Sequence, residues 1–321
     1  MGRYIVRRLL AAIPVILGVL LLVFVLLRLI PGDPVEVFYY GSDAGGTSNT
    51  SVSIDALEQA RAKLRLDKSI PEQFVFYIWD VMRLDLGRSF RTKQPITDVI
   101  GEQFPSTLVL TMAGMAVTLF IGLVAGVVSA MRHHTWVDYG SQFIAVLGVS
   151  VPNFLVGLLL IYIFSILMQD WIPALTLPAI ANGNGKELIM PALALGIGGA
   201  AIVARLTRSS MLDVMSRDYI RTARSKGVRE STVVWGHALK NALIPVVTIV
   251  GLQFGSLLIG AVVIEVVFSR KGIGFTLVKA ILTRDYTVVQ ALVMLAATIY
   301  VIANLLVDVL YTYIDPRVRL T

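Results

Sequence analysis

Four polar side chains interrupt apolar stretches that are long enough to cross a lipid bilayer: Asn153, Gln253, Ser256 and Glu265. A polar group is costly in lipid, so such a residue normally faces a cavity or another helix. Asn153 follows Pro152, which interrupts the helical hydrogen-bond ladder and frees carbonyl groups. Gln253 and Ser256 are three residues apart and so share one helical face. We expect these four residues to line a path for a solute.

Each assignment has a plainer alternative. Asn153 and Gln253 would also serve as polar contacts between helices. Glu265 lies near the end of its apolar stretch, where exposure to solvent or pairing with an arginine would account for it. Asp308 is expected to anchor the last helix at the cytoplasmic surface.

A second group of residues that could carry function is the basic segment 213–245, the longest polar interruption in the C-terminal half. Only Asp213, Asp218 and Glu230 oppose its positive charge. The cations that precede the next apolar stretch are Arg217, Arg221, Arg224, Lys226, Arg229 and Lys240. Apolar stretches long enough to span a membrane flank it on both sides. We expect it to lie at the cytoplasmic surface and contact a partner protein.

The residue order within this segment predicts a helix, a turn and a second helix. Asp218 begins the first helix, and Gly227 is expected to end it in the left-handed conformation. Ser231 begins the second helix, which is expected to end where the next span begins at Pro245. The alternative is an ordinary solvated loop. The apolar cluster at 233–235 argues against that alternative, because a solvated loop would not need it.

No catalytic set is present in the sequence. The HExxH, GxxxxGK[ST] and GxSxG patterns are all missing, so we expect neither enzymatic activity nor ATP hydrolysis by this chain. There is no cysteine and there are three histidines, which leaves little for a metal site. Catalytic residues and metal ligands are therefore predicted to be none.

The composition indicates the elements that must position these residues. Charged residues make up 15% of the 321 residues and hydrophobic residues 56%, with a mean hydropathy of +0.77. Soluble domains carry about 25% charged residues. The chain is therefore predicted to be an all-α integral membrane protein. We attribute the net charge of +7 to cytoplasmic loops rather than to nucleic-acid binding.

Six apolar stretches are predicted to be transmembrane helices. They cover residues 9–27, 108–131, 143–168, 190–204, 246–268 and 288–310. The first is predicted to be an uncleaved span rather than a signal peptide, since no small-residue cleavage site follows it. The fourth is short, with about 15 apolar residues where about 20 are typical. Its small residues predict close helix packing.

Between the first two spans, residues 31–102 are predicted to form an extracytoplasmic region. The chain then divides into 1–30, 31–102 and the permeation core 103–321. Within residues 31–102, Asp55 and Glu58 resemble a helix cap. A later amphipathic helix begins near Pro71 and is expected to pack on the membrane domain rather than on a partner. Its apolar face consists of Phe74, Ile78, Val81 and Met82.

Charge predicts the orientation. With a cytoplasmic N-terminus, the inner ends of the spans hold fourteen lysines and arginines and the short outer loops five. The positive-inside rule counts short loops, so both termini are predicted to be cytoplasmic.

The basic segment resembles the EAA loop of ATP-binding-cassette importer permeases. Arg221-Thr222-Ala223 stands where that family has a glutamate-alanine-alanine triplet, and Gly227 stands at its glycine. The run from His237 to Pro245, HALKNALIP, is similar to the dipeptide/oligopeptide/nickel branch. Further motifs fit that branch along nearly the whole chain. They are IPGDP at 30–34, DLGRS at 85–89, VPNF at 151–154, GIG at 272–274, RDY at 284–286, NLLVD at 304–308 and DPR at 315–317.

The resemblance implies a type I importer permease in a bacterial cytoplasmic membrane. Its expected partners are a homologous second permease, two ATPase subunits that hold ATP and magnesium, an extracytoplasmic solute-binding protein and the lipid bilayer, with no nucleic acid. This chain itself is expected to hold no cofactor. The expected substrates are dipeptides or short oligopeptides, and the alternative is nickel chelates or another small solute.

The resemblance also implies that the cytoplasmic helices transmit motion from the ATPases to the spans. The residues expected to make this coupling contact are Asp218, Tyr219, Arg221, Thr222, Ala223, Arg224, Lys226, Gly227, His237, Leu239 and Lys240. A rival from another class is a secondary transporter. A secondary transporter needs ionisable groups deep in the membrane and usually internal repeats, and neither is evident in the sequence.

Overall fold

A computed structural model describes residues 2–29, 58–59, 61–62, 65–181, 183 and 185–314. In this part of the chain all named elements are helices, and the only β-type pairing is an isolated bridge between Arg88 and Pro95. The chain packs as two compact units. The first unit contains residues 1–8, 105–275 and 299–321, and the second contains residues 9–104 and 276–298.

The prediction of six spans is confirmed: the described residues contain six helical segments long and apolar enough to cross a membrane. They run over Leu10–Leu29, Ile96–Met131, Asn153–Trp171, Lys186–Met215, Glu230–Val267 and Tyr286–Val307. The helices that carry most of them are α1 (Gly2–Leu29), α5 (Ile96–Met131), α9 (Ile189–Met215), α12 (Leu239–Val267) and α14 (Tyr286–Ile314).

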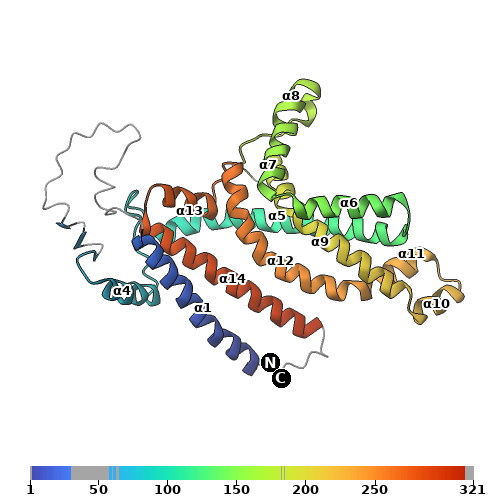
Figure 1. Cartoon of the computed structure of the whole chain (residues 1–321), viewed down its shortest axis with the longest axis horizontal. Coiled ribbons are helices and arrows are strands. Elements are labelled where there is room, and N and C mark those ends of the chain that lie inside the picture. Colours follow the sequence, from blue (N-terminus) through green and yellow to red (C-terminus); the bar gives the residue numbers. More distant parts are fainter. Residues whose placement is uncertain are drawn as a thin grey trace. The chain divides into compact units, whose positions relative to one another are not determined.

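The third span differs from its prediction. The stretch 143–168 was expected to cross the membrane with its helix interrupted at Pro152. The structure divides it there into α6 (Trp136–Ser150) and α7 (Asn153–Ile161), so the span itself begins only at Asn153. Val151 is extended, because the ring of Pro152 disfavours the helical conformation of the residue before it. After the break, α7 continues through a π-helical turn and α8 (Met168–Trp171) to complete the span. Figure 1 shows α7 leaving the line of α6 at a steep angle.

The fourth span is longer than its apolar run, because α9 continues past 204 through a polar end to Met215. Its small residues do allow close packing, as predicted. A Cβ atom at Gly196 would lie 2.5 Å from the carbonyl oxygen of Gly114 in α5. Only a residue without a side chain permits this approach of the two backbones.

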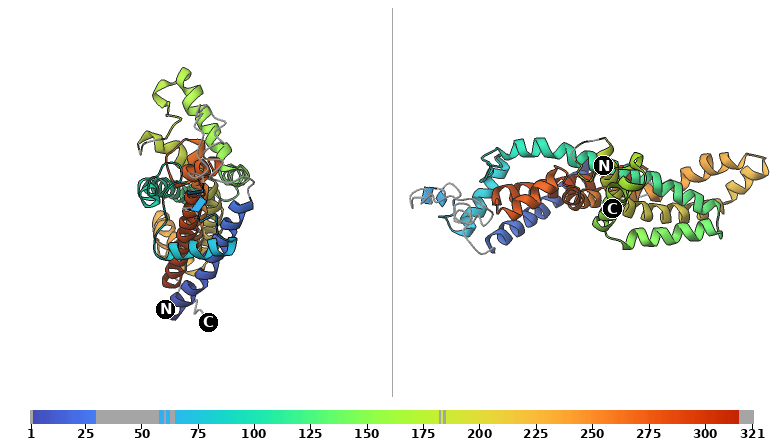
Figure 2. Two further views of the ribbon diagram at one scale, coloured as in Figure 1. Left: turned by 90° about the vertical axis from the view of Figure 1, so that its left-hand side faces the viewer. Right: turned by 90° about the horizontal axis from the view of Figure 1, so that it is seen from above.

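Within the first unit, α9 is the helix around which others pack: it contacts α6, α7 and α12. α9 and α12 lie beside each other, and the short helices α10 (Asp218–Ser225) and α11 (Glu230–Thr232) lie at one end of the pair (Figures 1 and 2). These two short helices belong to the basic segment singled out in the sequence. The unit thus presents that segment at the end of two spans.

Within the second unit, α4 (Ile70–Met82) packs on the span of α1. The ring of Phe24 lies 5.3 Å from Phe74 and 6.3 Å from Tyr77, measured between centroids. The expected packing of this helix on a membrane span is confirmed, although Met82 is exposed rather than packed. Ser69 caps the start of α4: its N–H and its hydroxyl both donate to the Glu72 carboxylate. The cap predicted at Asp55 lies outside the described residues.

Candidate functional site

The first helix of the basic segment forms as predicted, with α10 covering Asp218–Ser225. Gly227 follows it with a φ of +75°, the left-handed conformation that the sequence predicted. Its N–H donates to the carbonyl of Arg224 at 2.9 Å, and the N–H of Val228 donates to Ala223 at 3.3 Å. These bonds satisfy carbonyl groups at the helix end. A residue with a side chain would be strained here although nothing lies within 4 Å of the Cβ position.

The inner face of the segment is a packed core. Ile220, Val233 and Val234 have no exposed surface and cluster with Val127 of α5 and Met211 of α9. Burial of this kind does not occur in a solvated loop, so that alternative is excluded. The segment is a fixed part of the first unit, packed against residues of α5, α9 and α12.

The second helix of the segment extends further than predicted. It begins at Glu230, passes through a π-helical stretch at Val233–Ala238 and continues directly into α12. Pro245 was expected to mark a boundary, but it lies inside α12. Proline is tolerated inside membrane helices because neighbouring groups can compensate the lost hydrogen bond. The basic segment is therefore joined to the fifth span without a break.

The outer face carries the residues expected to couple to a partner. Nine of the eleven are exposed; Ala223 and Leu239 are partly buried against the core. Arg224 is paired with Glu230 at 2.6 Å, and this hydrogen bond raises the pKa of the guanidinium above its usual value. The amide of Asn241 donates to the hydroxyl of Tyr219 at 2.9 Å. Trp235 adds an exposed aromatic surface to this face.

The polar residues predicted to line a path are placed as follows. Asn153 and Gln253 both lie against the adjacent glycines of α9. A Cβ atom at Gly198 would lie 2.9 Å from Asn153 Oδ1, and one at Gly199 would lie 2.7 Å from Gln253 Oε1. The amide oxygen and nitrogen of Gln253 are both buried and have no hydrogen-bond partner within the described part of the chain. The structure thus brings these two amides to one helix, α9.

Ser256 is exposed, unlike the amide atoms of Gln253. Glu265 is fully buried: its carboxylate accepts hydrogen bonds from the Thr107 hydroxyl at 2.6 Å and from the N–H groups of Gly274 and Phe275 at 2.8 and 3.1 Å. It therefore caps the start of α13 (Ile273–Leu282). Its place on a path stays a prediction. The side chain of Asp308 lies outside the described residues.

Metal ligands do not come together: across the described ranges, no three His, Asp or Glu side chains form a group that could hold a metal ion.

Comparison with known proteins decides the family. Residues 122–320 match the family described as binding-protein-dependent transport system inner membrane component, and residues 1–111 match its N-terminal counterpart. The chain is 43% identical over 319 residues to a glutathione transport system permease protein of Pectobacterium atrosepticum, covering 99% of both chains. It is 41% identical to the protein of the same name from Escherichia coli K12, with the same coverage.

The chain belongs to this family of ABC importer permeases. It is a multi-pass inner-membrane protein and a transport subunit that works with ATPase subunits and a binding protein. A crystal structure of an amino acid ABC transporter with histidines shares the fold, with a TM-score of 0.52 and 13% identity over 68% of this chain and 94% of that one.

Sequence reasoning missed two groups of buried polar contacts in the permease, and the first lies in the second unit. Asp285 is almost fully buried and accepts hydrogen bonds from the Ser89 hydroxyl and from the N–H groups of Phe90 and Arg91. It also accepts a bond from the N–H of Val288 in the first turn of α14. An aspartate directly before an apolar helix is a capping signal that could have been read from the sequence. The contact with Ser89 could not.

A second missed junction of the permease is a buried ion pair in the first unit. Asp138 of α6 receives two hydrogen bonds from the Arg208 guanidinium of α9, at 2.6 and 2.7 Å. The Ser129 hydroxyl and the N–H of His134 also donate to it. These donors, Arg208 first, hold the pKa of the Asp138 carboxyl well below its usual range. In the sequence, Arg208 contributed only to the count of charges that predicts the orientation. Its pairing could not be predicted, because its partner lies 70 residues away.

Proposed function

We propose that this permease imports short peptides delivered by an extracytoplasmic binding protein. The observation that carries the proposal is the full-length identity of 41–43% to permeases named for glutathione transport. Glutathione is itself a short peptide. The uncharged amides of Asn153 and Gln253 support the same class, because they suit a zwitterionic solute without trapping it by charge.

The coupling surface is the exposed face of residues 217–240. Its packed inner face and its direct continuation into α12 support a role as a rigid element that an ATPase moves as a body. The exposed Tyr219, Trp235 and Lys240 offer aromatic and cationic contacts to a partner's cleft. A homologous second permease and two ATPases complete the proposed assembly, with both termini of this chain in the cytoplasm.

The test is uptake by the assembled transporter in proteoliposomes containing its binding protein and ATP. Glutathione, a set of dipeptides, single amino acids and a nickel chelate are supplied in turn. Peptide uptake that depends on both ATP and the binding protein is the expected result. Uptake of amino acids or of the chelate alone would reject the peptide assignment while leaving the permease role intact.

A further inference from the structure

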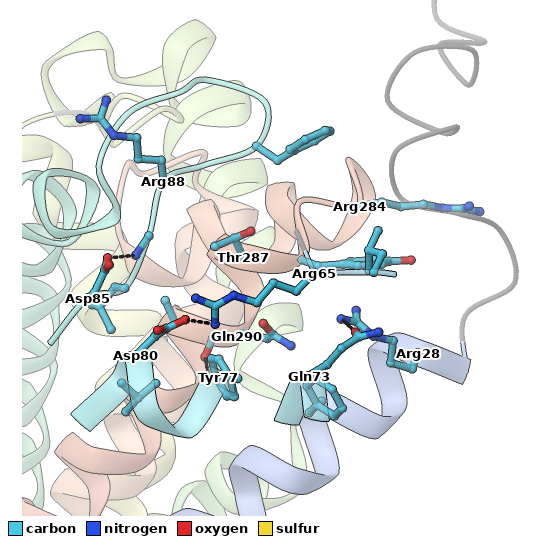
Figure 3. Close-up of a pocket in the computed structure, with 18 residues that line it drawn as sticks. Arg28, Arg65, Gln73, Tyr77, Asp80, Asp85, Arg88, Arg284, Thr287 and Gln290 are labelled. Carbon is cyan, nitrogen blue, oxygen red and sulfur yellow. Dashed lines mark hydrogen bonds and ion pairs between the residues drawn. The ribbon is translucent and has the colours of Figure 1, made fainter. Parts of the chain in front are cut away.

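The second unit contains a polar pocket that the proposed transport function does not explain. Its volume is about 330 Å³, and it lies between the end of α1, α4, the residues after α4 and the start of α14 (Figure 3). Four arginines and two aspartates contribute to its lining. The arginines are Arg28, Arg65, Arg88 and Arg284. The pocket is therefore net positive.

Its most informative cation is Arg28, on the last turn of α1. The Nε and Nη2 groups of Arg28 both donate to the neutral amide oxygen of Gln73, Nε at 3.0 Å, and the guanidinium lies 4.9 Å from the ring centroid of Phe24. Among the described residues it forms no ion pair. A half-buried cation with a neutral partner favours an anion nearby. Arg65, by contrast, is paired with Asp80 at 2.8 Å.

The opposite face of α4 indicates the environment of the pocket. Gln73 and Tyr77 face the pocket, whereas Val75, Trp79 and Met82 are 65%, 49% and 64% exposed on the other side. An apolar groove joins that side to Leu17, which lies within the α1 span. A helix with one polar and one apolar face at the end of a span is typical of a membrane interface. We therefore expect the pocket to lie at the depth of lipid headgroups.

We propose that this pocket binds a phosphate group, and that the phosphate belongs to a phospholipid of the surrounding leaflet. Arginine recognises phosphate through two parallel hydrogen bonds, and Arg28 lines the pocket from the last turn of the α1 span. The Gln290 side chain on α14 lines another wall and would donate to a phosphate oxygen. Bound lipid would link α1, α4 and α14 within the second unit. Basic pockets between membrane helices hold headgroups in this way.

The test measures lipid binding to the assembled transporter in detergent by native mass spectrometry, with phosphatidylglycerol as the titrated probe. Arg28→Gln should weaken binding about tenfold or more, as expected for loss of a charged hydrogen bond. Arg83→Gln is the matched control: Arg83 is an exposed arginine at the end of α4, stacked on Trp79 and outside the pocket. It should leave binding unchanged.

Arg28→Gln also removes the bond to Gln73, so a second variant is needed. Gln290→Leu leaves that bond in place and should weaken phosphatidylglycerol binding severalfold by itself. Equal losses in Arg28→Gln and Arg83→Gln, or wild-type binding in Gln290→Leu, would overturn the proposal. Inorganic phosphate is the second probe. If it binds the delipidated transporter as tightly as the lipid does, the pocket holds a free anion and the lipid assignment is wrong.

Discussion

The hydroxyl of Ser89 donates a 2.6 Å hydrogen bond to the carboxylate of Asp285, a residue 196 positions later. Both side chains are buried, and the same carboxylate caps α14. Two short motifs that the sequence related only by resemblance, DLGRS and RDY, are thus one structural junction of the second unit.

Loss of this junction should destabilise the permease. Ser89→Ala leaves part of a buried carboxylate without its donor, and we expect a cost of about 1–3 kcal/mol in the free energy of unfolding. Thermal unfolding of the purified chain measures it. The control is Ser150→Ala, because Ser150 is exposed and its hydroxyl donates to the Val146 carbonyl of its own helix. Equal melting temperatures for the two variants would show that the junction contributes nothing.

Gly227 should be required for coupling. Valine at a φ of +75° costs about 1–2 kcal/mol, which a membrane fold tolerates but a coupling contact of about 1–3 kcal/mol does not. Gly227→Val should reach the membrane yet lose both peptide uptake and ATP hydrolysis stimulated by the binding protein. Gly101→Val is the control, since Gly101 is an exposed glycine of α5 that lies outside residues 217–240, has open space at its Cβ position and has no positive φ. Wild-type values for Gly227→Val would remove the coupling role from this turn.

Gln253 should affect transport more than stability. Its buried amide has no partner among the described residues, so Gln253→Leu is expected to change the unfolding free energy by less than about 1 kcal/mol. Uptake should nevertheless fall if the amide contacts the solute. Gln73→Leu is the matched change at an amide that is hydrogen-bonded to Arg28 and to the Lys68 carbonyl, and it should lower the melting temperature. Normal uptake by Gln253→Leu would make this residue a packing contact only.

The Asp138–Arg208 pair should give the permease a specific acid sensitivity. The pKa of the Asp138 carboxyl is lowered in the folded chain, so its contribution to stability is complete above the unfolded value of about 3.9. That contribution is lost as the pH falls below this value toward the folded pKa. At pH 7, Asp138→Asn should cost about 3 kcal/mol, because Arg208 keeps a charge without its partner.

The measurement is unfolding of the wild type and of Asp138→Asn between pH 7 and pH 3. The difference between the two should shrink as the pH falls below about 4. Asp213→Asn is the control, because its ion pair with Arg217 is exposed and should contribute little at any pH. A difference that stays constant across this range would mean that the Asp138 carboxyl is not the titrating group.

Orientation can be tested directly, because the chain has no cysteine of its own. Asp67→Cys and Ser225→Cys place single thiols at exposed positions on opposite sides of the proposed topology. An impermeant maleimide should label position 67 in intact cells or spheroplasts and position 225 only after the membrane is opened. The reverse pattern would overturn the assignment of a cytoplasmic N-terminus.

The sequence by itself determined the number of spans and the turn at Gly227. Both depend on local properties: a run of apolar residues must lie in lipid, and a glycine between two helices tolerates a positive φ. Local rules also predicted the close packing of α9, since small residues allow backbones to approach. They predicted an interruption at Pro152, where the structure has one, and a boundary at Pro245, where the helix continues. One proline breaks a helix and the other lies inside one, and the choice depends on the surrounding packing.

Only the tertiary structure decided which polar residues meet. Ser89 with Asp285, Asp138 with Arg208, and Arg28 with Gln73 are pairs separated by 196, 70 and 45 positions. Nothing in the residue types around any of them specifies the partner. A buried polar group must find a donor or acceptor, but which one it finds is set by how the helices pack, and that depends on the whole fold.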